Sequence, residues 1–131
     1  AERIATALDS GDPEDEHSCF SDQTHLDIRA NFTGIKNVYL GIGFNSKKYS
    51  PSISELVAEK NPSLDKSIIQ LLKKTSNSIN NIPIPFDKML SGPKNSSGRQ
   101  AAEKTVSNLL VLAEKIKVAG NDLNWNVIIA E

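Results

Sequence analysis

The chain has almost no cysteine and no long apolar run, and these absences remove several classes of protein. Cys19 is the only cysteine of the 131 residues, so the chain can form neither an internal disulfide nor a zinc site built from cysteines. No hydrophobic stretch approaches the roughly 20 residues that a transmembrane helix needs. A hydrophobic content of 38% with 24% charged residues is ordinary for a globular protein, and the length suits one domain with its own core.

Lysine and arginine are absent from residues 9–27, where the acidic side chains are densest. This acidic segment holds seven carboxylates and two histidines. Residues 1–29 contain eight acids and two bases, whereas residues 30–131 contain eight acids and thirteen bases. Like charges at such density repel, so a cation, shared protons or basic groups from elsewhere must offset them. Because the bases are dispersed and the dense cluster is acidic, the composition argues against nucleic acid as a partner.

The acidic segment combines the side chains that bind transition metals, carboxylates and imidazoles. Consecutive residues would fan around a helix axis, so convergence on one ion requires an irregular backbone. Such a set suits iron, zinc or manganese better than calcium, which prefers an all-oxygen shell. The predicted metal ligands are Glu16, His17, Asp22 and His25.

Other roles for these side chains stay open on the residues alone. His25, between Asp22 and Arg29, is equally suited to local surface pairs. Glu16 and Asp22 are also suited to cap helix N-termini, where backbone amides favour negative charge. We favour a role in which these side chains orient a metal site whose principal ligands lie elsewhere, rather than direct metal ligation by this chain alone.

The residues around the second half of the acidic segment are expected to divide between core and surface. Cys19 and Phe20 are expected in the core, whereas Ser18 and Ser21 suit helix caps. The acidic surroundings argue against a nucleophilic role for Cys19.

Helical periodicity begins at the first residues. Residues 2–8 are typical of a short helix that Asp9–Pro13 ends with turn-forming residues. This helix has no capping residue before it and reads as the last turns of a helix already under way. We therefore expect the chain to be the C-terminal part of a longer protein.

Two further helices are predicted, and the first of them repeats apolar side chains every three or four residues, as one face of a helix does. The first is expected to begin at an Asp22 N-cap and to end at Gly41 and Gly43. The second is expected to begin with Ser50 as N-cap, with a proline at the first helical position, and to end near Lys60.

A third helix is predicted from Asn61 onward by the same spacing. Two prolines then exclude a helix interior at residues 82–86, so this segment is predicted to be an extended connection. The side chains expected to dock on the core are Ile82, Ile84 and Phe86, and Asp87 is expected to act as a cap.

The last predicted helix runs from about Arg99 to Ala119, after a polar loop at residues 91–98. Gly120 is expected to be its left-handed C-terminal cap, and residues 125–131 are expected to be an apolar tail packed on the bundle. With no strand pair and three or four long helices, the prediction is an all-α, up-down four-helix bundle.

Four sequence blocks resemble the imelysin family: EDEHSCFSD (Glu14–Asp22), TH..DI (Thr24–Ile28), GIKNVYLG (Gly34–Gly41) and IPIPFD (Ile82–Asp87). The resemblance spans nearly the whole chain. It implies a protein of two helical bundles with a cleft between them, of which residues 1–131 would be the C-terminal bundle.

The resemblance also implies a function. Family members are exported bacterial proteins, periplasmic or associated with the outer membrane, and linked to iron acquisition or regulation, so iron or zinc is the implied cofactor. The partners implied are the metal ion and the N-terminal half, which would carry the GxHxxE motif that this chain lacks and any membrane anchor. Residues expected to line the cleft are Glu14, Asp15, Ser18 and Asn31.

Two alternative functions accompany this prediction. The family is catalogued as a metallopeptidase family, but peptidase chemistry needs a metal-bound water and a general base. Neither HExxH nor HxxE occurs in the chain, and no catalytic residue is predicted. The other alternative is a non-catalytic interaction module whose acidic face docks a basic partner.

Overall fold

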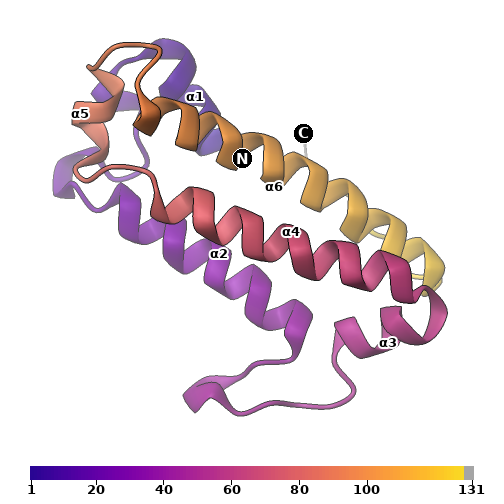
Figure 1. Ribbon diagram of the computed structural model, residues 1–131. Coiled ribbons are helices and arrows are strands. Elements are labelled where there is room, and N and C mark those ends of the chain that lie inside the picture. Colours follow the sequence, from indigo (N-terminus) through magenta and orange to yellow (C-terminus); the bar gives the residue numbers. More distant parts are fainter. Residues whose placement is uncertain (129–131) are drawn as a thin grey trace.

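Helices account for nearly all the regular structure in residues 1–128, the part of the chain that the computed structural model describes (Figure 1). The α-helices are α1 (Glu2–Ser10), α2 (Thr24–Leu40), α3 (Ile53–Lys60), α4 (Pro62–Asn80), α5 (Phe86–Leu90) and α6 (Ser97–Asp122). Within these residues there is no strand, only an isolated bridge between Ile42 and Lys48. None of the described helices has the length and apolar character needed to cross a membrane. The all-α prediction is confirmed.

The long helices alternate in direction, as predicted for an up-down bundle. α4 packs against both α2 and α6, and it runs antiparallel to each (Figure 1). The short α1 lies against the first half of α6 and occupies the fourth position of the bundle.

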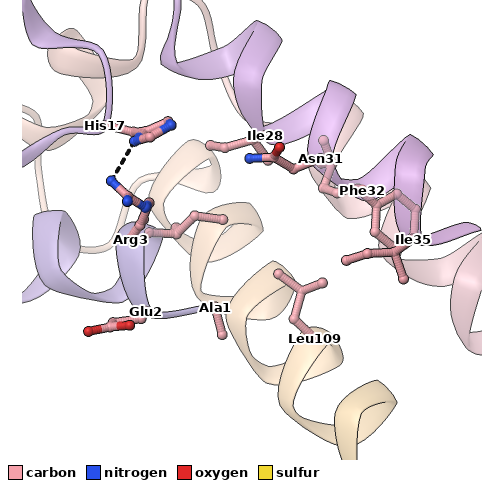
Figure 2. A pocket seen from close by; sticks show the side chains of 11 residues that line it. Ala1, Glu2, Arg3, His17, Ile28, Asn31, Phe32, Ile35 and Leu109 are labelled. Carbon is pink, nitrogen blue, oxygen red and sulfur yellow. Dashed lines mark hydrogen bonds between the residues drawn. The ribbon is translucent and has the colours of Figure 1, made fainter. Parts of the chain in front are cut away.

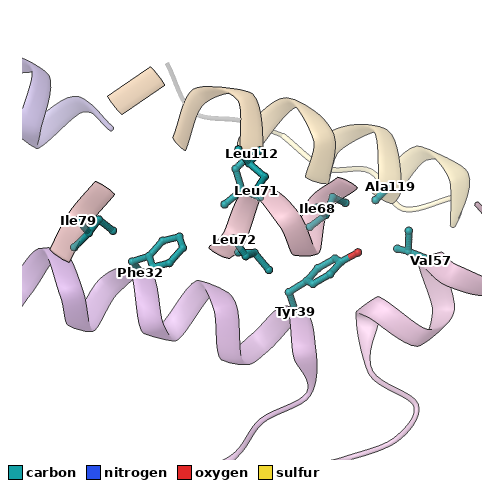
Figure 3. Close-up of a cluster of buried hydrophobic side chains, with 9 residues drawn as sticks. All are labelled: Phe32, Tyr39, Val57, Ile68, Leu71, Leu72, Ile79, Leu112 and Ala119. Carbon is teal, nitrogen blue, oxygen red and sulfur yellow. The ribbon is translucent and has the colours of Figure 1, made fainter. Parts of the chain in front are cut away.

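The core has two parts. The larger lies between α2, α3, α4 and α6, where helix-spaced apolar side chains meet across the bundle (Figure 3). The smaller lies where α1 and α5 cover the start of α6. The larger cluster consists of Phe32, Tyr39, Val57, Ile68, Leu71, Leu72, Ile79, Leu112 and Ala119. The smaller cluster consists of Ile4, Ala7, Leu8, Ile82, Phe86, Met89, Leu90 and Ala102.

The predicted start of the third helix, at Asn61, is confirmed. Asn61 caps α4, because its Oδ1 accepts a hydrogen bond of 3.2 Å from the Leu64 amide. The Ser50 prediction was wrong: α3 starts two residues later, at a capping box in which Ser52 and Glu55 bond each other's backbone amides. Asp22 does not cap α2 either, because it adopts a left-handed conformation (φ 53°) and Gln23 takes the cap position.

The role predicted for Gly120 was also wrong. α6 continues to Asp122, and Gly120 is a buried position inside it. A Cβ at this glycine would lie 2.3 Å from Val127 Cγ2, and the Trp125 amide donates a 2.8 Å hydrogen bond to the Gly120 carbonyl. The glycine thus permits close approach of the tail. Packing of the tail is confirmed at Val127, whereas residues 129–131 lie outside the described part.

The connection at residues 82–86 departs from the predicted extended form. Ile82 and Phe86 are buried as expected, but Ile84 is 55% exposed. The segment turns and bends instead of running straight, so its side chains do not alternate regularly. Phe86 opens the unpredicted helix α5, and Asp87 lies in the first turn of that helix without capping it.

Candidate functional site

The middle of the acidic segment, residues 11–23, folds as an irregular link between α1 and α2, and its two ends lie in those helices. It contains two short 3-10 turns, η1 (Pro13–Asp15) and η2 (Cys19–Ser21). The Asp12 side chain starts the first turn by accepting a 3.0 Å hydrogen bond from the Glu14 amide. Glu16 follows in an extended conformation. The irregular backbone packs this segment against α1.

Two adjoining pockets lie beside this segment. The first, here the acidic pocket, has a volume of about 270 Å³, and the second, here the mixed pocket, about 280 Å³. They share Glu2, Arg3 and His17. The acidic pocket is lined by Glu2, Arg3, Thr6, Asp15, Glu16 and His17. The mixed pocket adds an apolar wall, lined by Ala1, Ile4, Ile28, Asn31, Phe32, Ile35, Ile79 and Leu109 (Figure 2).

Arg3 and His17 meet where the two pockets adjoin (Figure 2). Arg3 Nη1 donates to His17 Nδ1 at 2.7 Å. A guanidinium can only donate, so this nitrogen of the imidazole accepts and the proton of the neutral ring lies on Nε2. His17 Nε2 is 4.0 Å from Asp27 Oδ2, which also accepts the Ser18 hydroxyl. A base from α1 thus lies among the acidic residues that line the acidic pocket.

Glu16 is the buried carboxylate of the segment, with only 6% of its surface exposed. Burial raises the pKa of Glu16, and this effect exceeds the lowering by the hydrogen bond from Thr24. The negative charges of Asp87 and Asp22 raise the pKa further, whereas His25 lowers it. The negative charge of Glu16 is therefore less favourable here than on a free glutamate, and a cation or a further donor would relieve that cost.

Several polar atoms in this part of the chain are buried without a hydrogen-bond partner. They include Glu16 Oε2, His25 Nδ1, Arg29 Nε and Asp87 Oδ1. An unpaired buried polar group costs about 1–3 kcal/mol, so these atoms gain most from a ligand or a donor. Asp87 was not predicted to act here, because it belongs to α5 and no sequence spacing relates it to Glu16.

The comparisons with known proteins identify the family. The family model described as Imelysin, peptidase family M75, matches residues 1–116. This chain belongs to the imelysin family. The search of curated proteins found no match. The matched span includes every residue that lines the acidic and mixed pockets.

The predicted ligands of this imelysin chain are only partly brought together. Glu16 and His17 line the acidic pocket with Asp15, while Asp22 and His25 are near enough to Glu16 to affect its pKa. Among residues 1–128, no three His, Cys, Asp or Glu side chains are grouped as a metal site. The four-residue ligand set stays a prediction.

The predicted cleft residues lie in different settings. Asp15 lines the acidic pocket and Asn31 the mixed pocket. Glu14 is exposed, and Ser18 is bonded to Asp27. That these four residues line a cleft facing a second helical bundle stays a prediction.

Phe20 is the clearest error in this segment. It was expected in the core, but it is 100% exposed on the turn η2, whereas the neighbouring Cys19 is half-buried. The turn is only three residues long and contributes no buried residue, so it has no inward face for the ring.

Proposed function

We propose that this imelysin chain takes part in binding a transition-metal ion at the acidic pocket, and that the protein acts in iron acquisition or regulation. The observation that supports this proposal is the lining of one pocket by three carboxylates and an imidazole beside Thr6 and the single base Arg3; these acidic and imidazole side chains are Glu2, Asp15, Glu16 and His17. Carboxylate oxygen and imidazole nitrogen together suit iron or zinc. The ion, when bound, would neutralise the charge of the acidic segment.

Glu16 is the strongest candidate ligand by its surroundings. One of its oxygens accepts from Thr24, and the other, Oε2, is buried and without a partner. A cation at Oε2 would stabilise the charged carboxylate, which burial disfavours. His17 is less free, because its Nδ1 is bonded to Arg3. We therefore infer that this chain supplies part of a ligand set.

The remaining ligands would come from a second helical bundle across a cleft. This arrangement is the one that the family resemblance implies, with residues 1–131 as the C-terminal bundle. The full exposure of Phe20 within the acidic segment is consistent with docking, since burial of an exposed aromatic side chain is favourable. We also propose that the protein is exported to the periplasm or the outer membrane, and cell fractionation tests this location.

Calorimetric titration of Fe(II) and Zn(II) into the full-length protein, which would carry both bundles, tests the metal site. The Glu16→Gln/His17→Gln variant should bind at least tenfold more weakly than the wild type, because both donors are lost. Glu114→Gln is the matched control: it removes an exposed carboxylate on α6, far along the chain from the pocket, and should leave binding unchanged. Equal affinity of the double variant and the wild type would remove the acidic pocket from the site.

A metal-dependent peptidase is the second candidate, favoured by the family's classification and by the apolar wall that adjoins the acidic pocket. A peptide side chain could rest on that wall while its backbone reached the carboxylates. Cleavage of a peptide that stops on adding a chelator and resumes with metal would support this function. Metal binding without any cleavage would leave the acquisition proposal in place and reject the peptidase.

A further inference from the structure

The loop that joins α2 to α3, residues 41–52, carries exposed aromatic and basic side chains and no acid. Phe44 is 88% exposed and Tyr49 54% exposed. Lys47 and Lys48 lie between them in sequence, and both are exposed. Figure 1 shows this loop reaching away from the long helices, beyond the end of α2. The loop is thus a projecting tip with an apolar apex and a positive charge.

Backbone hydrogen bonds hold the tip in shape. The Gly43 amide donates to the Lys47 carbonyl at 2.8 Å, and the Tyr49 amide donates to the Gly41 carbonyl at 2.7 Å. The Tyr49 ring packs over Gly43, where a Cβ would lie 2.4 Å from the ring. Phe44 is therefore displayed by an ordered turn.

The basic side chains of the tip and the acidic segment lie at opposite ends of α2. Lys47 Nζ lies 5.2 Å from the centre of the Tyr49 ring, and Lys48 Nζ lies 3.4 Å from Glu55 Oε1. The acidic segment precedes the other end of α2, which has 17 residues. At 1.5 Å per residue this helix is about 25 Å long, more than two Debye lengths at physiological salt. The acidic segment is therefore too distant to cancel the positive charge of the tip, which is offset only in part, by Glu55 beside Lys48.

We propose that the 41–52 loop docks on an anionic lipid bilayer. Phe44 would enter the boundary between headgroups and acyl chains, and Tyr49 would lie at headgroup level, where amphipathic rings are enriched. Lys47 and Lys48 would contact the anionic headgroups. A stable protein interface engages about 20–30 residues on each side, so this narrow tip suits a soft lipid surface better than a protein partner. The inference does not depend on the metal site.

Co-sedimentation with vesicles tests the docking. The wild type should bind vesicles of phosphatidylglycerol and phosphatidylcholine, and it should bind much less to pure phosphatidylcholine. Binding should weaken as salt rises, because the lysine contribution is screened. The variant Lys47→Gln/Lys48→Gln should bind the anionic vesicles about tenfold more weakly than the wild type does. The control variant Lys73→Gln/Lys74→Gln, which changes an exposed pair on α4, should bind as the wild type does.

A tryptophan reporter locates the contact. Trp125 is the only tryptophan, so a Trp125→Phe background is silent. Phe44→Trp in that background should shift its emission to the blue on addition of anionic vesicles. Phe20→Trp, from a phenylalanine that is even more exposed, should not shift. Absence of vesicle binding, equal shifts at both positions, or equal loss in the two lysine pairs would each overturn the proposal.

Discussion

Tyr39 and Asp65 are hydrogen-bonded in the interior of the bundle, with the phenolic O–H of α2 donating to Oδ1 of α4 at 2.8 Å. Ser54 of α3 donates to the same oxygen at 2.7 Å. A buried carboxylate is stable only with such donors, and this one joins three helices through a single atom. Burial raises the pKa of Tyr39 above its ordinary value of 10.0, and the bond to Asp65 raises it further.

Tyr39→Phe should destabilise the fold by about 1–2 kcal/mol, because Asp65 loses one of two donors. Urea unfolding at neutral pH measures the difference. The raised pKa sets the pH dependence: the Tyr39 contribution is complete below pH 10 and declines above it, because the unfolded chain ionises first. The wild type and the variant should therefore converge in alkali. Tyr49→Phe, at a half-exposed ring, is the control and should change little; equal effects of both variants would contradict the prediction.

Glu16→Gln should stabilise the chain at neutral pH in the absence of metal. The pKa of Glu16 is raised above 4.5 by burial and by the charges of Asp87 and Asp22, so the folded state holds this proton more tightly than the unfolded chain does. Its contribution to stability is present below pH 4.5 and is lost as the pH rises through the raised pKa. The uncharged amide avoids that loss and can still accept the bond from Thr24.

Thermal unfolding at several pH values tests this prediction. The melting temperature of Glu16→Gln should exceed that of the wild type at pH 7, and the two should approach each other near pH 4. Glu14→Gln, an exposed neighbour, should show no such convergence. A Glu16→Gln variant that is less stable than the wild type at pH 7, in the presence of chelator, would contradict the assignment.

Local signals predicted the helices well, because apolar periodicity and caps lie within a few residues of each other in sequence. The helix from Asn61 follows from such a signal. Ser50 and Ser52 both precede α3, and the choice between them depends on which one lies three residues before Glu55. The Ser50 hydroxyl bonds the Glu55 side chain instead, at 2.9 Å.

The surroundings of the candidate site could not be predicted in the same way. The pairing of Arg3 with His17 and the proximity of Asp87 to Glu16 depend on how α1 and α5 pack, and no local pattern encodes that packing. The residue types of the site, in contrast, were evident from the acidic segment itself. The sequence thus predicts which side chains are available, while tertiary packing decides which of them meet.

Two helical glycines should respond to alanine in opposite ways. Gly34 is exposed on α2, and a Cβ there would have nothing within 4 Å, so Gly34→Ala should stabilise the chain by about 0.5–1 kcal/mol. Gly120→Ala gains the same helix propensity but places a Cβ against Val127. It should release the tail and change the emission of Trp125, whose amide bonds Gly120. Urea unfolding and tryptophan fluorescence measure both effects; unchanged emission in Gly120→Ala would contradict the close packing.

Arg99 connects three helices at the end of the bundle that carries the acidic pocket. Its side chain is 7% exposed and donates to the carbonyls of Leu8 on α1 and Leu90 on α5. Arg99→Met keeps the apolar stem and removes both donors, so it should cost about 2–3 kcal/mol, as loss of charged hydrogen bonds does. Lys104→Met, on the exposed face of α6, is the matched control.

The same variant should loosen α1, because the bond to Leu8 fixes the C-terminal turn of that helix to α6. Limited proteolysis should then cleave Arg99→Met within residues 1–12 sooner than the wild type or Lys104→Met. α1 carries Glu2 and Arg3, which line the acidic pocket, so metal affinity should fall although no pocket residue is changed. Loss of stability with unaltered proteolysis of α1 would mean that Arg99 acts through α5 alone, and the link from this buried arginine to the pocket would be broken.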